Sequence, residues 1–217
     1  MTAPPPAAGR AAVLFSGGKD SALAALLLEP HYDVTLVTCG FGLTDLTEHA
    51  AESAAAFGLP HETRRLPESV LESAVDRLLA DGYPNEAVQS VHEAAVERLA
   101  EEASEAGWDV VADGTRRDDR TPTVPRPFAQ SVEDRHGVSH VAPLAGYGRG
   151  AVDRLVETRL TVETGPSEEL PKGDYETALR VALRERAGEV AVTEVFPDHE
   201  QSRVVGRRGA VSRSRRG

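Results

Sequence analysis

The sequence predicts an α/β protein with a doubly wound parallel sheet, and three observations carry that prediction. Short apolar runs alternate with longer segments of helical spacing along the chain. The connections between successive runs are long enough to be crossover helices. A length of 217 residues fits one ordinary domain, or one domain with a small appendage.

The first half of the chain supplies four predicted strands. Ala11–Phe15 is a continuous apolar run, as expected of a strand that is buried on both faces. Residues 33–39, 61–66 and 109–112 are predicted as the next three strands. Helices are predicted between these strands at residues 20–29, 44–57, 68–80 and 85–106.

The second half predicts a smaller set of elements. Residues 138–143 are expected to form a fifth strand and residues 189–196 a late strand. Helices are predicted at residues 151–160 and 174–187. The loop over residues 115–127 has no predicted secondary structure, and a loop of that length is more often functional than idle.

Four regions follow from this pattern. Residues 1–10 are rich in Pro and Ala and are expected to be a disordered leader. Residues 11–145 form the sheet domain, and residues 146–197 form a small C-terminal α/β extension of the same domain. Residues 198–217 are predicted to be a flexible, Arg-rich tail.

Composition excludes several classes of protein. Apolar residues make up 40% and charged residues 27%, so the chain is neither collagen-like nor broadly disordered. No run approaches the roughly 18 to 20 apolar residues of a membrane helix, and the N-terminus lacks a secretory signal, so we expect a soluble cytoplasmic protein. Cys39 is the single cysteine, which excludes an internal disulfide, a CxxC pair and a cysteine-based metal site.

Charge is distributed unevenly. The net charge of -11 argues against broad wrapping of nucleic acid by the main body. The last 17 residues contain no acid and six arginines, which either contact RNA or solubilise the chain: Arg203, Arg207, Arg208, Arg213, Arg215 and Arg216. Only two of the 24 basic residues are lysine, so a halophilic habitat is one hypothesis and GC-biased codon usage is another.

The most informative segment is Ser16-Gly17-Gly18-Lys19-Asp20-Ser21, between the first predicted strand and helix. Its glycines let the backbone approach a ligand, and a helix start offers unpaired N–H groups to an anion. The segment is not a Walker-type loop, because Val13 and Asp20 stand where that pattern needs Gly and Ser or Thr. The turn therefore predicts phosphate binding, and a capped strand–helix turn without a ligand is the alternative.

Residues 16–21 resemble the PP-loop signature Ser-Gly-Gly-x-Asp-Ser of the N-type ATP pyrophosphatases, the adenine nucleotide alpha hydrolase-like superfamily. The resemblance extends over about residues 11–145 by order of elements. It implies attack of a substrate oxygen on the α-phosphate of ATP, loss of pyrophosphate, and capture of the adenylated intermediate by a nitrogen or sulfur nucleophile. The residues implied to hold pyrophosphate are Ser16, Gly17, Gly18, Lys19 and Ser21, and Asp20 is implied to help place Mg²⁺.

A second constellation follows the fourth predicted strand, at Asp113–Arg120. It resembles a Gly-Thr-Asn-Ala-Asp-Asp motif of the sulfur-transferase branch, with Arg116-Arg117 in place of Asn-Ala. In that reading Gly114 and Thr115 line the nucleotide. Asp118 acts on the substrate and Asp119 binds Mg²⁺, and a solvated loop with local charge pairing is the alternative.

Two isolated residues complete the candidate site. Lys172 precedes a predicted helix and either stabilises the adenylation transition state or is an ordinary surface lysine. Cys39 ends the second predicted strand at the same sheet edge as the turn. It is a sulfur carrier or nucleophile, it lies where the backbone meets the adenine, or it is a small buried apolar residue, which is the interpretation that we favour.

The resulting expectation is an ATP- and Mg²⁺-dependent adenylating enzyme of ligase or sulfurtransferase type. Its acceptor and its nitrogen or sulfur donor are not readable from the sequence, and tRNA modification and a homodimer are both compatible with it. The alternative is a nucleotide-binding sensor without turnover, resembling universal-stress-type proteins.

Overall fold

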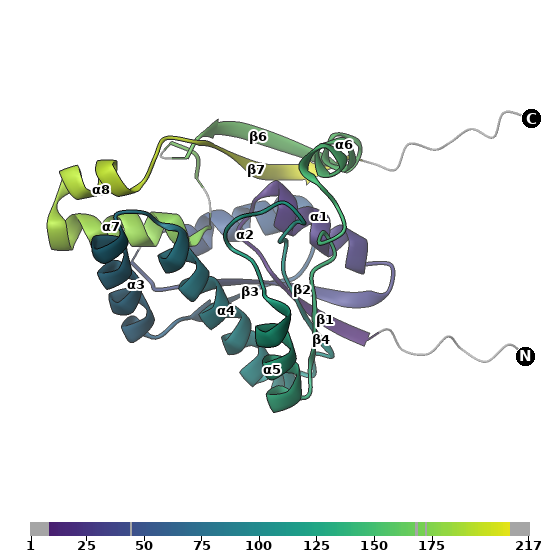
Figure 1. Ribbon diagram of the computed structural model, residues 1–217. Coiled ribbons are helices and arrows are strands. Elements are labelled where there is room, and N and C mark those ends of the chain that lie inside the picture. Colours follow the sequence, from purple (N-terminus) through teal and green to yellow (C-terminus); the bar gives the residue numbers. More distant parts are fainter. Residues whose placement is uncertain (1–8, 44, 168, 172, 209–217) are drawn as a thin grey trace, which may run out of the picture.

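The central sheet of the protein has five parallel strands. A computed structural model describes residues 9–43, 45–167, 169–171 and 173–208 (Figure 1). The strands are β1 (Gly9–Leu14), β2 (Tyr32–Gly40), β3 (His61–Arg65), β4 (Val110–Ala112) and β5 (Ser139–Val141). Their order is β3-β2-β1-β4-β5, and each neighbouring pair is parallel. The predicted doubly wound α/β fold is confirmed.

Helices cover both faces of this sheet. One face carries α1 (Lys19–Leu28), α2 (Leu46–Phe57) and α6 (Arg149–Arg159). The opposite face carries α3 (Glu68–Asp81), α4 (Asn85–Ala106), α5 (Arg126–His136) and α7 (Tyr175–Ala187). Side chains of β1 alternate between the two cores, with Ala12 and Leu14 in one and Ala11 and Val13 in the other. A strand buried on both faces is therefore apolar at every position.

A two-stranded antiparallel sheet lies over α1 and α2, beside α6 (Figure 1). It pairs β6 (Leu160–Pro166) with β7 (Glu200–Arg207). Val204 of β7 is fully buried in the core beneath, and its N–H donates to the carbonyl oxygen of Gly17 at 2.8 Å. The C-terminal part of the chain is thus attached directly to the glycine-rich turn.

Several predicted elements need correction. The late strand at residues 189–196 is wrong, because Glu189–Val195 forms the helix α8. The flexible tail is wrong for residues 200–207, which form β7, and the disordered leader is wrong for residues 9 and 10, which belong to β1. The helix α5 begins at the end of the predicted long loop and was not anticipated. Residues 1–8 and 209–217 lie outside the described part of the chain.

Membrane insertion finds no support in the described helices. None of them is both long enough and apolar enough to cross a bilayer.

Candidate functional site

A cavity of about 870 Å³ opens at the carboxyl ends of β1, β2 and β4. The strand order turns in opposite directions on the two sides of β1, so this edge is the topological switch point at which doubly wound sheets bind ligands. The glycine-rich turn and the loop after β4 form one side of the cavity, as the sequence predicts. The segments around α7 and β7 contribute a further wall, which the sequence did not reveal.

The turn itself is held by backbone hydrogen bonds to the C-terminal extension, which in the structure continues beyond residue 197 and includes β7. Gly17 has a φ of 78°, in the left-handed region that favours glycine. The carbonyl oxygen of Ser16 accepts from the N–H of Gly173 at 2.9 Å, and that of Gly17 accepts from Val204. Gly17 does not line the cavity, so its contribution is the path of the backbone.

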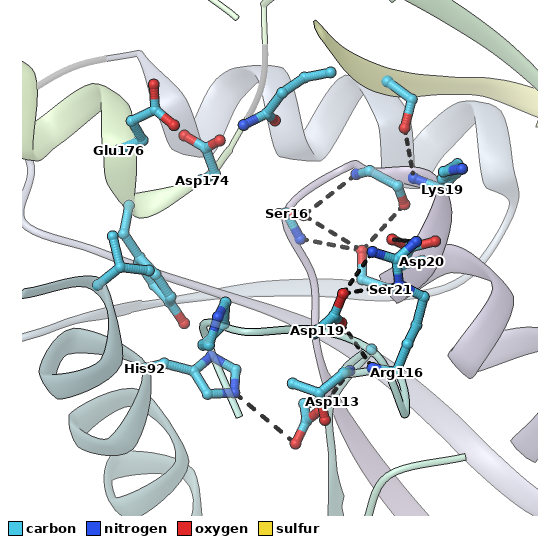
Figure 2. A pocket seen from close by; sticks show the side chains of 18 of the residues that line it. Ser16, Lys19, Asp20, Ser21, His92, Asp113, Arg116, Asp119, Asp174 and Glu176 are labelled. Atoms are coloured by element: carbon cyan, nitrogen blue, oxygen red, sulfur yellow. Dashed lines mark hydrogen bonds and ion pairs between the residues drawn. The ribbon is translucent and has the colours of Figure 1, made fainter. Parts of the chain in front are cut away.

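The backbone N–H groups of Gly18 and Lys19 have only weak partners in the part of the chain that the structure describes. The N–H of Gly18 donates to Ser16 Oγ at 3.3 Å, and the N–H of Lys19 donates to Ser202 Oγ at 3.4 Å. Both distances are beyond the usual range for such bonds. Ser21 Oγ lies 3.5 Å from Ser16 Oγ and donates to the carbonyl oxygen of Gly18 at 3.1 Å (Figure 2). An anion that carries full negative charge would be a stronger acceptor for these donors.

Charged groups meet at the start of α1. Lys19 Nζ is paired with the carboxylate of Asp153 on α6. Asp20 Oδ2 lies 3.6 Å from Arg116 Nη1, whereas Asp20 Oδ1 is buried and has no hydrogen-bond partner. Burial raises the pKa of Asp20 above its ordinary value, although Arg116 and Lys19 oppose the shift. One oxygen of this carboxylate is therefore buried without a hydrogen-bond partner in the described part of the chain.

The loop after β4 separates the two aspartates that the sequence proposed. Asp119 lines the cavity, but its Oδ2 accepts from the N–H of Arg116 at 2.7 Å and its Oδ1 accepts from Arg116 Nε at 2.9 Å. Asp118 is exposed, does not line the cavity, and accepts from the N–H of Arg149 at 2.9 Å at the start of α6. The structure thus does not bring Asp118 into the cavity with the turn.

Gly114 and Thr115 do line the cavity, but Gly114 also has a packing role. A Cβ at this position would lie 2.7 Å from the backbone nitrogen of Ser21 and 2.8 Å from the carbonyl carbon of Asp20. The loop after β4 therefore lies directly against the first turn of α1, and only glycine permits that approach.

A buried carboxylate and two histidines form a group that sequence reasoning missed. Asp113 is completely buried, and its Oδ2 is 2.8 Å from His140 Nε2. The same oxygen is 3.9 Å from His92 Nε2, which faces it in Figure 2. His92 lines the cavity from α4, and its Nε2 has no hydrogen-bond partner among the described residues. The three residues are distant in the sequence, and only the position of Asp113 at a strand end could have signalled the group.

The remaining predicted residues have different outcomes. Cys39 lines the cavity, but it is 2% exposed, and burial raises the pKa of its thiol to about 12. The thiol is therefore neutral at physiological pH, as expected of a buried apolar residue. Lys172 lies outside the described residues. Asp174, two positions later, caps α7 and lines the cavity.

The fold and the cavity define an α/β protein with a glycine-rich turn at the switch point of its sheet. The chain belongs to the family described as "Family of unknown function (DUF7411)", whose model matches residues 10–206. The uncharacterized protein MJ0690 of Methanocaldococcus jannaschii is 38% identical over 195 residues, which cover 89% of this chain and 94% of that protein.

Solved structures of two other proteins are similar to the chain. A predicted subunit of tRNA methyltransferase from Methanocaldococcus jannaschii matches with a TM-score of 0.82 at 35% identity, covering 94% of this chain and 100% of that one. The U34-tRNA thiolase NcsA from Methanococcus maripaludis matches with a TM-score of 0.47 at 20% identity, covering 70% of this chain and 57% of that one.

Proposed function

We propose that the protein is an ATP-dependent adenylating enzyme of tRNA modification, which cleaves ATP to AMP and pyrophosphate. The observation that carries the proposal is the turn over residues 16–21, placed at the switch point of the sheet with backbone donors that lack good acceptors. Its agreement with the PP-loop signature supplies the reaction type.

The residues of the cavity fit a nucleoside triphosphate. A volume of about 870 Å³ lies in the range of cavities that enclose small-molecule ligands. The N–H groups of Gly18 and Lys19, the Lys19 ammonium and Arg116 supply positive charge on one side. Apolar side chains, among them Val37 and Phe196, line other parts of the cavity and suit an adenine ring.

For Mg²⁺, the best protein ligand in this cavity is Asp20, whose Oδ1 has no partner. Asp119 would have to give up Arg116 before it could bind a cation. One or two carboxylates are enough, because Mg²⁺ commonly completes its octahedron with phosphate oxygens and water. The ion, when bound, would neutralise charge on the phosphates and fix their orientation.

In the proposed reaction a substrate oxygen attacks the α-phosphorus and the bond to the β-phosphate oxygen breaks. Negative charge then grows on the departing pyrophosphate, and the turn's N–H groups with Lys19 stabilise it. Lys19 exchanges Asp153 for a phosphate oxygen when ATP enters. The donors are fixed in advance, because the extension holds the carbonyl groups of Ser16 and Gly17.

The proposed acceptor is tRNA, and the support is the M. jannaschii structure described as a predicted tRNA methyltransferase subunit. Cys39 is too deeply buried to carry sulfur as a thiolate, so the nitrogen or sulfur donor would be another molecule.

Methyl transfer from S-adenosylmethionine is the second candidate, because that same description names a methyltransferase. S-adenosylmethionine has no phosphate chain, and its one carboxylate could satisfy fewer of the donors around the turn than the phosphates of ATP. The proposal therefore favours ATP. Parallel titrations of the protein with ATP and with S-adenosylmethionine compare the two candidates directly.

The test is ATP–pyrophosphate exchange with unmodified tRNA transcripts, comparing Lys19→Ala with Asp153→Asn. Both variants break the Lys19–Asp153 ion pair, but only Lys19→Ala removes the ammonium. We expect Lys19→Ala to lower exchange by about 100-fold or more, and Asp153→Asn to keep ATP affinity or to increase it. Intact binding of ATP without exchange would favour the sensor alternative. Formation of ADP, or equal losses in both variants, would contradict the proposed chemistry.

A further inference from the structure

The described arginines of this acidic protein differ in whether a carboxylate pairs with them. Many of them are paired with a carboxylate. Arg203 and Arg207, which the sequence assigned to a flexible tail, are paired with Glu52 and Glu29. Arg207 also lies over the ring of Phe57, 4.2 Å from its centroid. These two side chains fasten β7 to α1 and α2. They are therefore poorly placed to contact RNA, and Arg213, Arg215 and Arg216 lie outside the described residues.

A second group lies at one border of the cavity and has no carboxylate partner among the described residues. We call it the arginine lip, and it consists of Arg117, Arg120, Arg149 and Arg154, all of them exposed. None of the four takes part in an ion pair within the described part of the chain. Arg65 and Arg77, on β3 and α3, are also exposed and without an ion pair among the described residues, so what distinguishes the lip is its position beside the cavity.

Backbone contacts bring the lip together from two segments. The N–H of Arg117 donates to the carbonyl oxygen of Tyr147 at 3.3 Å, and the Arg117 guanidinium reaches Gly148. Arg154 Nε donates to the carbonyl oxygen of Gly150 at 3.1 Å, which directs this side chain back toward the start of α6. Arg149 itself lines the cavity.

Nearby carboxylates are already engaged elsewhere. Asp119 is bound to Arg116 and Asp153 to Lys19. Asp118 accepts from the backbone of Arg149 at the start of α6. It forms no ion pair with the arginine head groups among the described residues, although its carboxylate is close enough to Arg117 for the two charges to interact. The lip therefore presents several planar guanidinium groups to solvent beside the cavity, in the arrangement that suits phosphodiester oxygens.

We propose that the arginine lip binds the phosphate backbone of the RNA acceptor and so directs the nucleotide to be modified into the cavity. This inference rests on the proposed function for its choice of RNA. ATP would occupy the turn at residues 16–21, whereas the lip lies on the exposed border, where a polymer too large for the cavity can still be held. Contacts of this kind position a nucleic acid without reading its sequence.

The experiment measures binding of a labelled tRNA transcript by fluorescence anisotropy at several salt concentrations. The test variant is Arg117→Glu with Arg154→Glu, which leaves Arg149 in the cavity wall unchanged. The control is Arg65→Glu with Arg77→Glu, which makes the same change in net charge. Arg65 and Arg77 are exposed, form no ion pair within the described residues, and lie on β3 and α3, away from α6.

We expect the test variant to raise the Kd for tRNA by tenfold or more, and to reduce the slope of log affinity against log salt by about 1.5. The control should change the Kd by less than about threefold. ATP affinity should be unchanged in both variants, and their thermal unfolding should match that of the parent.

Three results would overturn the inference: equal losses in both variants, no tRNA binding by the parent at 50 mM salt, or binding that only removal of residues 209–217 abolishes. The first would mean that the loss follows from the change in total charge and not from the position of the lip, and the last would assign the contact to residues 209–217. If the test variant lost tRNA binding but the parent did not bind ATP, the role of the arginine lip in RNA binding would stand and the adenylation proposal would be refuted.

Discussion

Asp113 shows how a single buried carboxylate organises the site. Burial alone would raise its pKa, but His140 and His92 face it and the N–H of Thr115 donates to Oδ1 at 2.7 Å. The balance holds the pKa of Asp113 well below its ordinary value, so the group is ionised in the folded protein. It fixes both the histidine pair and the backbone that leads to Gly114 and Thr115.

The pH dependence of folding follows from this shift. Because the folded-state pKa lies below the unfolded value of about 3.9, Asp113 stabilises the fold fully above that pH, and its contribution is lost as the pH falls further. Asp113→Asn should lower the free energy of unfolding by about 2–4 kcal/mol at pH 7, since it leaves His140 without its carboxylate partner. Urea unfolding at pH 7 and pH 3 measures the difference. A gap between parent and variant that does not narrow in acid would contradict this account.

At the scale of elements, the contact between the β4 loop and α1 depends on one missing methyl group. Gly114→Ala would place a Cβ within 2.8 Å of the backbone at Asp20 and Ser21, so the turn or the loop must move. We expect a loss of about 1–3 kcal/mol in stability and weaker binding of MgATP. Gly146→Ala is the matched control, because a Cβ there meets nothing within 4 Å. Thermal unfolding and calorimetric titration of both variants provide the comparison, and equal behaviour would disprove close packing at Gly114.

Elements that depend on local pattern were predictable, and those that depend on distant partners were not. The apolar run of β1 and the turn after it are contiguous, so both were visible in the sequence. Residues 189–196 are rich in β-branched and apolar side chains, which favour a strand, but Val192 and Val195 are buried three residues apart on a helix. The strand β7 is largely polar, and it is held by β6, about forty residues earlier, and by α1 and α2, which are still more distant in the sequence.

The same distinction applies to the candidate site. Residues 16–21 could be found because the proposed phosphate donors of the turn all lie in one short segment of the sequence. Asp153, Ser202 and His92 reach the cavity from α6, β7 and α4, and no spacing in the sequence connects them with the turn. The prediction that Asp118 acts on the substrate relied on its neighbourhood in the sequence, whereas its side chain is directed to the backbone of α6.

At the scale of the whole molecule, the glycine-rich turn lies between the main sheet and the C-terminal extension. The extension shares both cores with the sheet, through Val156 and Val204 on one face and Leu179 on the other. Its backbone holds the turn at Ser16 and Gly17. Folding of the last described strand is therefore a condition for the geometry of the turn.

Truncation separates the role of this strand from that of the residues beyond it. A chain that ends after residue 199 lacks β7, and with it the buried Val204, the Arg207–Glu29 pair and the bond to Gly17. We expect it to lose more than about 3 kcal/mol of stability and all measurable affinity for MgATP, because burial of one valine alone contributes about 1.5 kcal/mol or more. A chain that ends after residue 208 keeps every one of these contacts and should match the parent in both measurements. If the shorter chain still bound MgATP with the parent's affinity, the turn would be held by the sheet alone, and the extension would have no part in shaping the site.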